Sequence, residues 1–243
     1  MRLPIHGTHR RGSLRAMTWI GVLVVVLVLL FLVGLLAPTT HNRNPRLENR
    51  IRCANKLKNL GLALQLFATD NEGQFPWRVS IEKGGSLEEL ADDSRIWRHF
   101  QAMSNELGTP MRLQCRTDTN IPGHVELRWM YGAPPTNDSK LRQFSHNDHV
   151  SYFLATGFPE KDANRILAGD RNLTRNGVSV RGRIQTATHD RFGFTKPGHH
   201  EGGGNLLFTD GSVQQVSSSK AARVFTAGLA PIGTNPPPVL LIP

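Results

Sequence analysis

The C-terminal third of the chain gathers side chains that could bind a metal ion or carry out acid–base chemistry. They are His189, Asp190, His199, His200, Glu201 and Asp210. Imidazole and carboxylate groups are among the ligands that zinc takes in proteins. The spacing fits neither the H-E-x-x-H pattern of zinc enzymes nor a calcium loop with alternating acidic ligands. The sequence therefore predicts no catalytic residue, no metal site and no cofactor. The alternative to a metal site is a structural one, in which an imidazole hydrogen-bonds across a hairpin to Asp210.

That hairpin is predicted from the residues on either side of Asp210-Gly211. Residues 205–209 and 212–216 have strand character, and two residues separate them. Asp-Gly suits a type I′ turn, in which both central residues have positive φ. This register would place Phe208 opposite Val213, on the face that packs against the stem helix.

The elements that would position these groups begin with an apolar segment. Residues 17–36 carry no charge and are mostly Val and Leu, which predicts a transmembrane helix over 17–37. Arg2, Arg10, Arg11 and Arg15 precede it. Residues 1–16 are therefore expected to be a basic cytoplasmic leader of a single-pass inner-membrane protein, with the rest outside the cytoplasm. A cleaved secretory signal is the alternative.

After a joint at 38–46, we expect a head domain over 47–229 and a Pro-rich tail over 230–243. Within the head, an apolar stripe at three- and four-residue steps predicts an amphipathic stem helix over 47–69. Residues 86–107 are expected to form one or two helices with Ser86 as N-cap. Strand character recurs at 149–154 and again from residue 165.

The charge balance restricts the partners only loosely. The 243 residues include 29 Lys and Arg against 19 Asp and Glu, a formal net charge of +10. Such a chain is attracted to anionic surfaces. The basic residues are scattered, and no run of five like charges occurs, so no specific nucleic acid is predicted as a partner.

The start of the apolar segment resembles the N-terminus of type IV prepilins and type II secretion pseudopilins. The similarity lies in Arg15 to Val25. It implies peptidase cleavage between Ala16 and Met17, and it places Pro38 where pilins carry a helix-kinking proline. Ala16 stands where that family has glycine, and Gly21 stands where it has an acidic residue.

The stem helix is similar to that of a bacterial pseudopilin-like family with a prepilin-type N-terminus and a C-terminal H-x9-D-G motif. The similar stretches are Arg50 to Leu64 and Asn71 to Pro76. The motif itself is supplied here by His200, Asp210 and Gly211.

Two further segments resemble the same family. Leu113 to Asp118 is similar to its Cys-Pro-Ser-Asp segment, with Arg116 in place of the proline. Ala168 to Asn172 matches its Ala-Gly-Asp-Arg-Asn. We interpret Asp170 beside Arg171 as a structural pair that caps a turn rather than as a catalytic pair.

The resemblance implies an α+β, pilin-like fold, in which a long N-terminal helix packs on a small antiparallel sheet. It implies a membrane-anchored, non-catalytic structural protein of a secretion or pilus-like envelope assembly. The implied partners are the lipid bilayer and other pseudopilins or secretion-apparatus subunits. Two alternatives stay open: a membrane-tethered metal-dependent enzyme using His189, His199, His200 and Asp210, or a basic binding module for DNA or an anionic glycan.

The two cysteines are Cys53 and Cys115, and neither belongs to a C-x-x-C motif. Zinc ribbons and thioredoxin-like sites are therefore disfavoured. A disulfide between them would tie the Cys115 loop to the stem helix, and it suits an oxidising compartment. Two buried thiols that never meet are the alternative.

Overall fold

The computed structural model describes residues 19–36, 45–121, 126–129, 141–157, 164–196, 200, 202–230 and 237–243. The chain divides into two compact units, residues 1–43 and residues 44–243. Each unit is described by itself. The predicted cleavage residues Ala16 and Met17 and the predicted kink at Pro38 lie outside the described residues.

The first unit contains one described helix, α1, over Trp19–Leu36. No helix in the described part of the chain combines the length and apolar character needed to cross a membrane. The predictions of a transmembrane helix over 17–37, of single-pass topology and of an inner-membrane location are therefore corrected.

The second unit begins with helix α2, over Pro45–Asp70. It confirms the stem helix predicted over 47–69. Its buried side chains recur at helical spacing and include Cys53, Leu57, Leu60, Leu64 and Phe67. The amide of Gly73 donates to the carbonyl of Ala68 at 2.7 Å, and Gly73 has a φ of 81°, so a left-handed glycine closes the helix end.

A six-stranded antiparallel sheet forms the centre of this unit, in the order β10-β9-β4-β3-β11-β7. Its strands are β3 (Tyr152–Thr156), β4 (Ile166–Asp170), β7 (Gly182–Gln185), β9 (Gly203–Phe208), β10 (Val213–Ser217) and β11 (Val239–Ile242). The helix beside this sheet confirms the α+β class with antiparallel strands. Because β11 pairs with both β3 and β7, the last residues belong to the head's sheet rather than to a separate tail.

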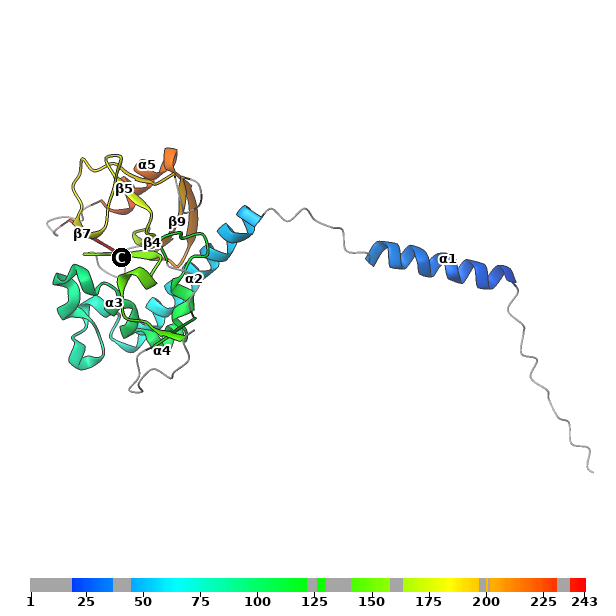
Figure 1. The fold of residues 1–243 in the computed structure, drawn as a ribbon, viewed down its shortest axis with the longest axis horizontal. Coiled ribbons are helices and arrows are strands. Elements are labelled where there is room, and N and C mark those ends of the chain that lie inside the picture. Colours follow the sequence, from blue (N-terminus) through cyan, green and yellow to red (C-terminus); the bar gives the residue numbers. More distant parts are fainter. Residues whose placement is uncertain are drawn as a thin grey trace, which may run out of the picture. The chain divides into compact units, whose positions relative to one another are not determined.

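The sheet is covered on both faces, as Figure 1 shows. Helix α2 packs on one face, where Leu154 and Leu207 join its buried side chains in one core. Helix α5 (Ser218–Gly228) packs on the other face, where Phe153 and Leu206 meet Phe225. A small sheet of β5 (Leu173–Arg175), β6 (Val178–Ser179) and β8 (Phe192–Phe194) completes that second core. All five residues of β3 are consequently buried.

Short helical turns connect α2 to the sheet. They are η1 (Pro76–Arg78), η2 (Ile81–Lys83), η3 (Leu87–Ala91), η4 (Asp93–Arg95), α3 (Trp97–Ala102), α4 (Ser104–Leu107), η5 (Pro110–Leu113) and η6 (Asn147–His149). A separate parallel pair joins β1 (Glu126–Arg128) to β2 (Leu141–Gln143). The predicted helices over 86–107 are thus present as two short α-helices over 97–107, preceded by 3-10 turns, and the Ser86 hydroxyl makes no cap hydrogen bond. It contacts His99 Nδ1 at 2.7 Å instead.

The C-terminal hairpin exists, but the predicted register is wrong by one residue. Val213 pairs with Leu207, not with Phe208. The amide of Phe208 donates to the Ser212 carbonyl at 2.9 Å, which leaves a three-residue loop. Only Gly211 in that loop has positive φ (79°), so the connection resembles a type I turn with a glycine bulge rather than a type I′ turn.

The shift matters because side chains alternate between the faces of a strand. Leu207 points toward α2, and a Cβ added at Gly61 of that helix would lie 2.8 Å from Leu207 Cδ1. Phe208 belongs to the core on the opposite face, with Phe225. Glycine at position 61 therefore allows α2 to approach β9 closely.

Leu207→Ala should lower the free energy of unfolding by about 2–5 kcal/mol, because it opens a cavity between α2 and β9. Urea unfolding of the full chain measures this loss. Gln214→Ala, at an exposed position of the neighbouring strand, is the control and should change stability little. Equal small effects in the two variants would contradict the observed register.

The buried His99 should make stability depend on pH. Burial lowers the pKa of His99 from 6.5 to about 4. Between these values the unfolded chain binds a proton that the folded chain does not, so stability falls as the pH drops from 6.5 to 4 and levels off below that range. The loss should be about 3 kcal/mol.

Urea unfolding at a series of pH values measures this dependence. His99→Gln cannot titrate, and its stability should fall less over the same range. Parallel pH profiles for the two chains would show that His99 is not the group responsible.

Candidate functional site

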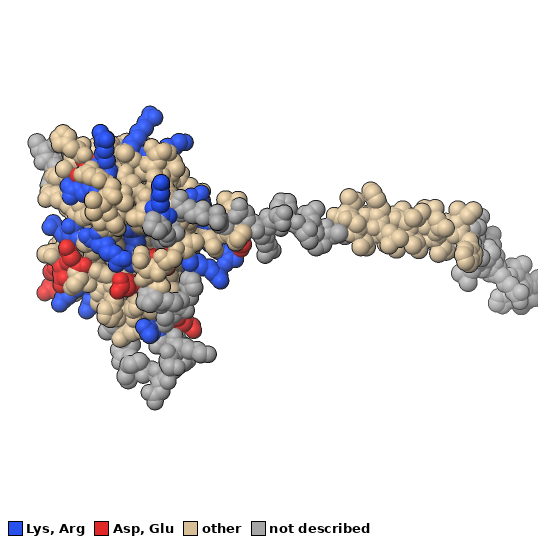
Figure 2. All heavy atoms as spheres, turned by 45° about the horizontal axis from the view of Figure 1, so that its top comes forward, with Lys and Arg blue, Asp and Glu red and all other residues tan. Residues whose placement is uncertain are grey.

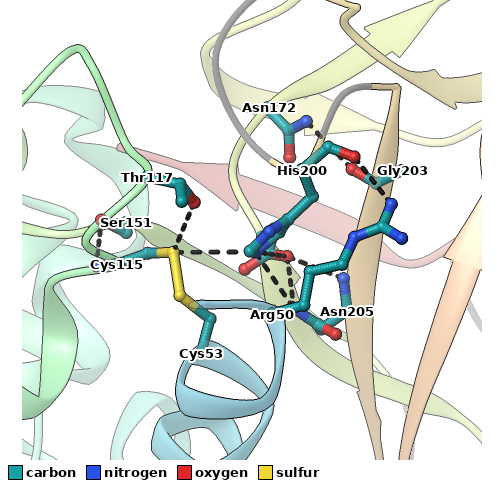
Figure 3. A network of polar contacts seen from close by, with 10 residues as sticks. Arg50, Cys53, Cys115, Thr117, Ser151, Asn172, His200, Gly203 and Asn205 are labelled. Atoms are coloured by element: carbon teal, nitrogen blue, oxygen red, sulfur yellow. Dashed lines mark hydrogen bonds and ion pairs between the residues drawn. A yellow bond between two sulfur atoms is a disulfide. The ribbon is translucent and has the colours of Figure 1, made fainter. Parts of the chain in front are cut away.

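His200 lies at the centre of a buried polar cluster that joins α2, the sheet and two loops (Figure 3). Its side chain is 2% exposed. Its Nε2 lies 3.4 Å from Asp170 Oδ2, 3.3 Å from Asn205 Nδ2 and 3.7 Å from Cys115 Sγ. The φ of His200 is +45°, which is strained for a residue with a side chain. The surrounding contacts must therefore hold its backbone in place.

Asp170 is positioned by the end of β4, opposite Tyr152 of β3. Its side chain is fully buried. Oδ2 accepts hydrogen bonds from the Asn205 backbone amide at 2.7 Å and from Asn205 Nδ2 at 2.9 Å. A buried carboxylate is stable only when such donors replace water. Asn205, near the start of β9, thus fixes the carboxylate beside His200.

The disulfide between Cys53 and Cys115 forms one wall of the cluster, and it confirms the predicted pairing. It crosses 62 residues of sequence and brings the two Cα atoms to 5.5 Å. The Cys115 amide donates to Ser151 Oγ at 2.8 Å. Helix α2 is therefore linked covalently to a loop that is itself hydrogen-bonded to the approach to β3.

Arg50 of α2 adds a second link to the same region. Its Nη2 donates to the backbone carbonyl of His200 at 2.7 Å. A Cβ added at Gly203 would lie 3.0 Å from that nitrogen, so the absence of a side chain there leaves room for the guanidinium. The strained backbone of His200 is thus held from the helix side as well as through its ring.

A buried ion pair lies close to the cluster. Arg171 Nε and Asp118 Oδ2 are 2.8 Å apart, and the two side chains are 3% and 0% exposed. Burial lowers the pKa of Arg171, and Asp118 opposes that shift. Burial, followed by the charges of Asp170 and Asp118, raises the pKa of Tyr152 well above its ordinary value. Tyr152 therefore stays protonated.

The predicted pairing of Asp170 with Arg171 takes a different form. The two neighbours use different partners: Asp170 contacts Asn205 and His200, and Arg171 contacts Asp118. The predicted turn-capping pair is thus replaced by two separate buried contacts.

Among the described residues, the other candidate metal-binding groups do not gather around His200. His189 is exposed, and Asp190 accepts from Arg175 Nε at 2.6 Å. Asp210 accepts from the Ser212 amide at 2.9 Å in the hairpin loop. Hydrogen bonds from the Ser212 side chain and backbone lower the pKa of Asp210. His199 and Glu201 lie outside the described residues, and the predicted imidazole contact with Asp210 is replaced by the contact of His200 with Asp170.

Two features of the cluster have no signal of their own in the sequence. Asn205 lies within a predicted strand, and the sequence pattern does not predict the pair of Asp118 with Arg171. The one available signal was that Asp118 and Arg171 both fall in segments that resemble the pseudopilin-like family. Sequence spacing alone could not find the pair, because 53 residues separate the two positions.

The geometry does not suit nucleophilic catalysis. A Cys–His–Asp relay needs the nucleophile at one ring nitrogen and the carboxylate at the other. Here Cys115 Sγ and Asp170 Oδ2 both approach Nε2 of His200. The sulfur is also held in a disulfide and has no lone thiolate to attack with. The arrangement can instead hold four separate segments together.

Two hollows in the surface reach this cluster. One, of about 580 Å³, is lined by Cys53, Arg52, Lys56 and Arg116. Lys56 Nζ donates to the carbonyls of Met111 and Gln114, and burial, with smaller contributions from Arg116 and Arg52, lowers the pKa of Lys56. The other, of about 280 Å³, is lined by residues that include His200, Arg50 and Lys220.

Basic side chains are not confined to these hollows. Figure 2 shows Lys and Arg spread over the visible face of the head, with Asp and Glu in smaller groups. This spread matches the scattered charge in the sequence. This distribution of charge indicates no specific anionic partner.

Comparison of the chain with family models, with curated proteins and with solved structures found no match. The functional argument therefore rests on the residues and their geometry.

Removing one partner of the buried pair should be costly. Asp118→Asn should lower the free energy of unfolding by about 3–5 kcal/mol, because the Arg171 guanidinium would be left buried without a counter-charge. The loss of stability in the double variant Asp118→Leu/Arg171→Leu should be smaller than the sum of the losses in Asp118→Leu and in Arg171→Leu.

Urea unfolding of these variants measures both effects. The exposed pair of Arg52 and Glu48, 2.6 Å apart, provides the control, and Glu48→Gln should change stability little. Strictly additive losses in the double variant would show that the buried charges do not depend on each other.

Proposed function

We propose that this chain is a structural, non-catalytic subunit of a secretion or pilus-like assembly, of the pseudopilin-like kind with an H-x9-D-G motif. One observation carries the proposal. The segments that resemble that family lie far apart in sequence, yet they meet around the disulfide and His200. Cys53 comes from the stem helix, Asp118 from the Cys115 segment, and Asp170 from the end of β4.

The H-x9-D-G spacing has a direct structural use in this arrangement. His200 sits in the buried cluster at the start of β9, and Asp210-Gly211 forms the loop at its far end. The nine intervening residues contain strand β9. The motif therefore fixes both ends of the strand that packs on the stem helix through Leu207. A role in architecture accounts for these residue types without any reaction.

The stem helix also offers a surface for other subunits. On α2, four large apolar side chains point away from the sheet: Leu47 (53% exposed), Ile51 (49%), Leu62 (55%) and Leu66 (46%). Their intervals of four and eleven residues place them on one stripe of the helix. Helix α1 likewise exposes its large apolar side chains. Side-by-side packing of copies would remove such stripes from water.

The experiment targets the outward stripe of α2. Leu62→Glu/Leu66→Glu should leave the fold intact, because both side chains are exposed, but should prevent packing between subunits. Sedimentation of native extracts from the producing cells should show the wild-type chain in large particles and the variant as small ones.

Val178→Glu is the matched control, since Val178 is 68% exposed on β6, away from the stem. It should assemble as the wild type does. The proposal would be contradicted if the wild-type chain sediments as a monomer at its native expression level. It would also be contradicted if the stem variant assembles as the wild type does.

A further inference from the structure

The disulfide and His200 bring three potential metal ligands together in the described part of the chain. The sulfurs of Cys53 and Cys115 and a ring nitrogen of His200 all lie within 4.8 Å of one another. All three residues are buried. Zinc–sulfur bonds of about 2.3 Å and zinc–nitrogen bonds of about 2.0 Å put sulfur and nitrogen ligands roughly 3.5 Å apart in a tetrahedral site. Cys115 Sγ and His200 Nε2 are 3.7 Å apart.

Two potential metal ligands lie close to the same ring nitrogen of His200. Cys115 Sγ and Asp170 Oδ2 lie 3.7 Å and 3.4 Å from Nε2 of His200, which is wrong for a proton relay but close to the distance between neighbouring ligands of a metal ion. The bond between the two sulfurs prevents such a site in the oxidised chain, because metals bind thiolates rather than disulfides.

We propose that reduction of the Cys53–Cys115 disulfide turns this cluster into a zinc site with Cys53, Cys115 and His200 as ligands. A dithiol reductant supplies two electrons and two protons, becoming a disulfide itself, and the protein bond opens to two thiols. Zn²⁺ then binds both sulfurs as thiolates, and the two protons are released to solvent. Soft thiolates and imidazole are ligands that zinc prefers.

The residues around the disulfide favour thiolate formation and metal coordination. Cys53 lines the hollow of about 580 Å³, and the basic side chains of Arg52, Lys56 and Arg116 in the same lining favour a thiolate there. Asp170 Oδ2, 3.4 Å from His200 Nε2, is the oxygen placed to complete the coordination once the sulfurs separate. Asn205 already orients that carboxylate through two hydrogen bonds.

The consequence is a crosslink that survives a change of redox state. In the oxidised chain, the disulfide ties α2 to the Cys115 loop. In the reduced chain, the metal would tie the same two segments and add the His200 loop as a third. The head would keep its architecture under conditions that otherwise remove its only covalent link among the described residues.

Cobalt titration tests this proposal on the full chain. The protein is reduced with excess dithiol, which is then removed by gel filtration without oxygen, and Co²⁺ is added. Reduced wild type should bind one Co²⁺ per chain and show a thiolate-to-cobalt charge-transfer band, which zinc then abolishes by displacement. The oxidised chain should show no such band.

His200→Asn tests the third ligand, and asparagine tolerates the positive φ of this position. After reduction, this variant should bind Co²⁺ at least tenfold more weakly than wild type. His189→Asn, which changes an exposed histidine, is the matched control and should bind as wild type does. Circular dichroism of each reduced chain checks that the fold is present.

Three results would overturn the proposal. One is a folded, reduced wild-type chain without a thiolate–cobalt band. Another is equal cobalt affinity in His200→Asn and wild type. The last is a reduced chain that unfolds and regains no structure when zinc is added.

Discussion

The link between helix α2 and the loop at Cys115 is the constraint on which the rest of the head depends. A disulfide that closes 62 residues can stabilise a fold by about 4 kcal/mol through the unfolded chain alone. Its position adds to that effect. The sulfurs lie against His200, whose ring also contacts Asp170, and the carboxylate of Asp170 holds the start of β9 through Asn205. Covalent and hydrogen-bonded links thus meet at one point.

This point lies at the edge of an apolar core, and the two environments support each other. Leu207 and Gly61 bring β9 and α2 into close contact. The side chains of the polar cluster are buried, which strengthens their hydrogen bonds but makes any unpaired charge costly. The buried pair of Asp118 and Arg171 follows the same rule. Such a cluster specifies one arrangement of its segments.

Much of the fold follows from local pattern. The apolar stripe over 47–69 predicts α2 because one face of a helix must be buried, and the strand character near 149–154 and after 165 predicts β3 and β4. The disulfide was predictable because only two cysteines exist. Asp210-Gly211 correctly marks a hairpin. The turn type was not predictable, since a one-residue shift satisfies the local sequence equally well and only packing against Gly61 and Phe225 decides it.

Other features depend on contacts that sequence spacing does not encode. The contact of His200 with Asp170 arises because β4 and β9 are neighbours in the sheet, whereas Asp210 is merely closer in sequence. The insertion of β11 between β3 and β7 depends on the same topology. The membrane prediction was based on apolar composition alone, and no helix in the described part of the chain meets the requirements for crossing a bilayer.

Peptide mapping of the native chain, digested without reduction and with free thiols blocked beforehand, tests the central link most directly. The account predicts one disulfide-linked peptide pair containing Cys53 and Cys115, which separates only when a reductant is added. Recovery of both cysteines as blocked free thiols from the natively produced, folded chain would contradict it.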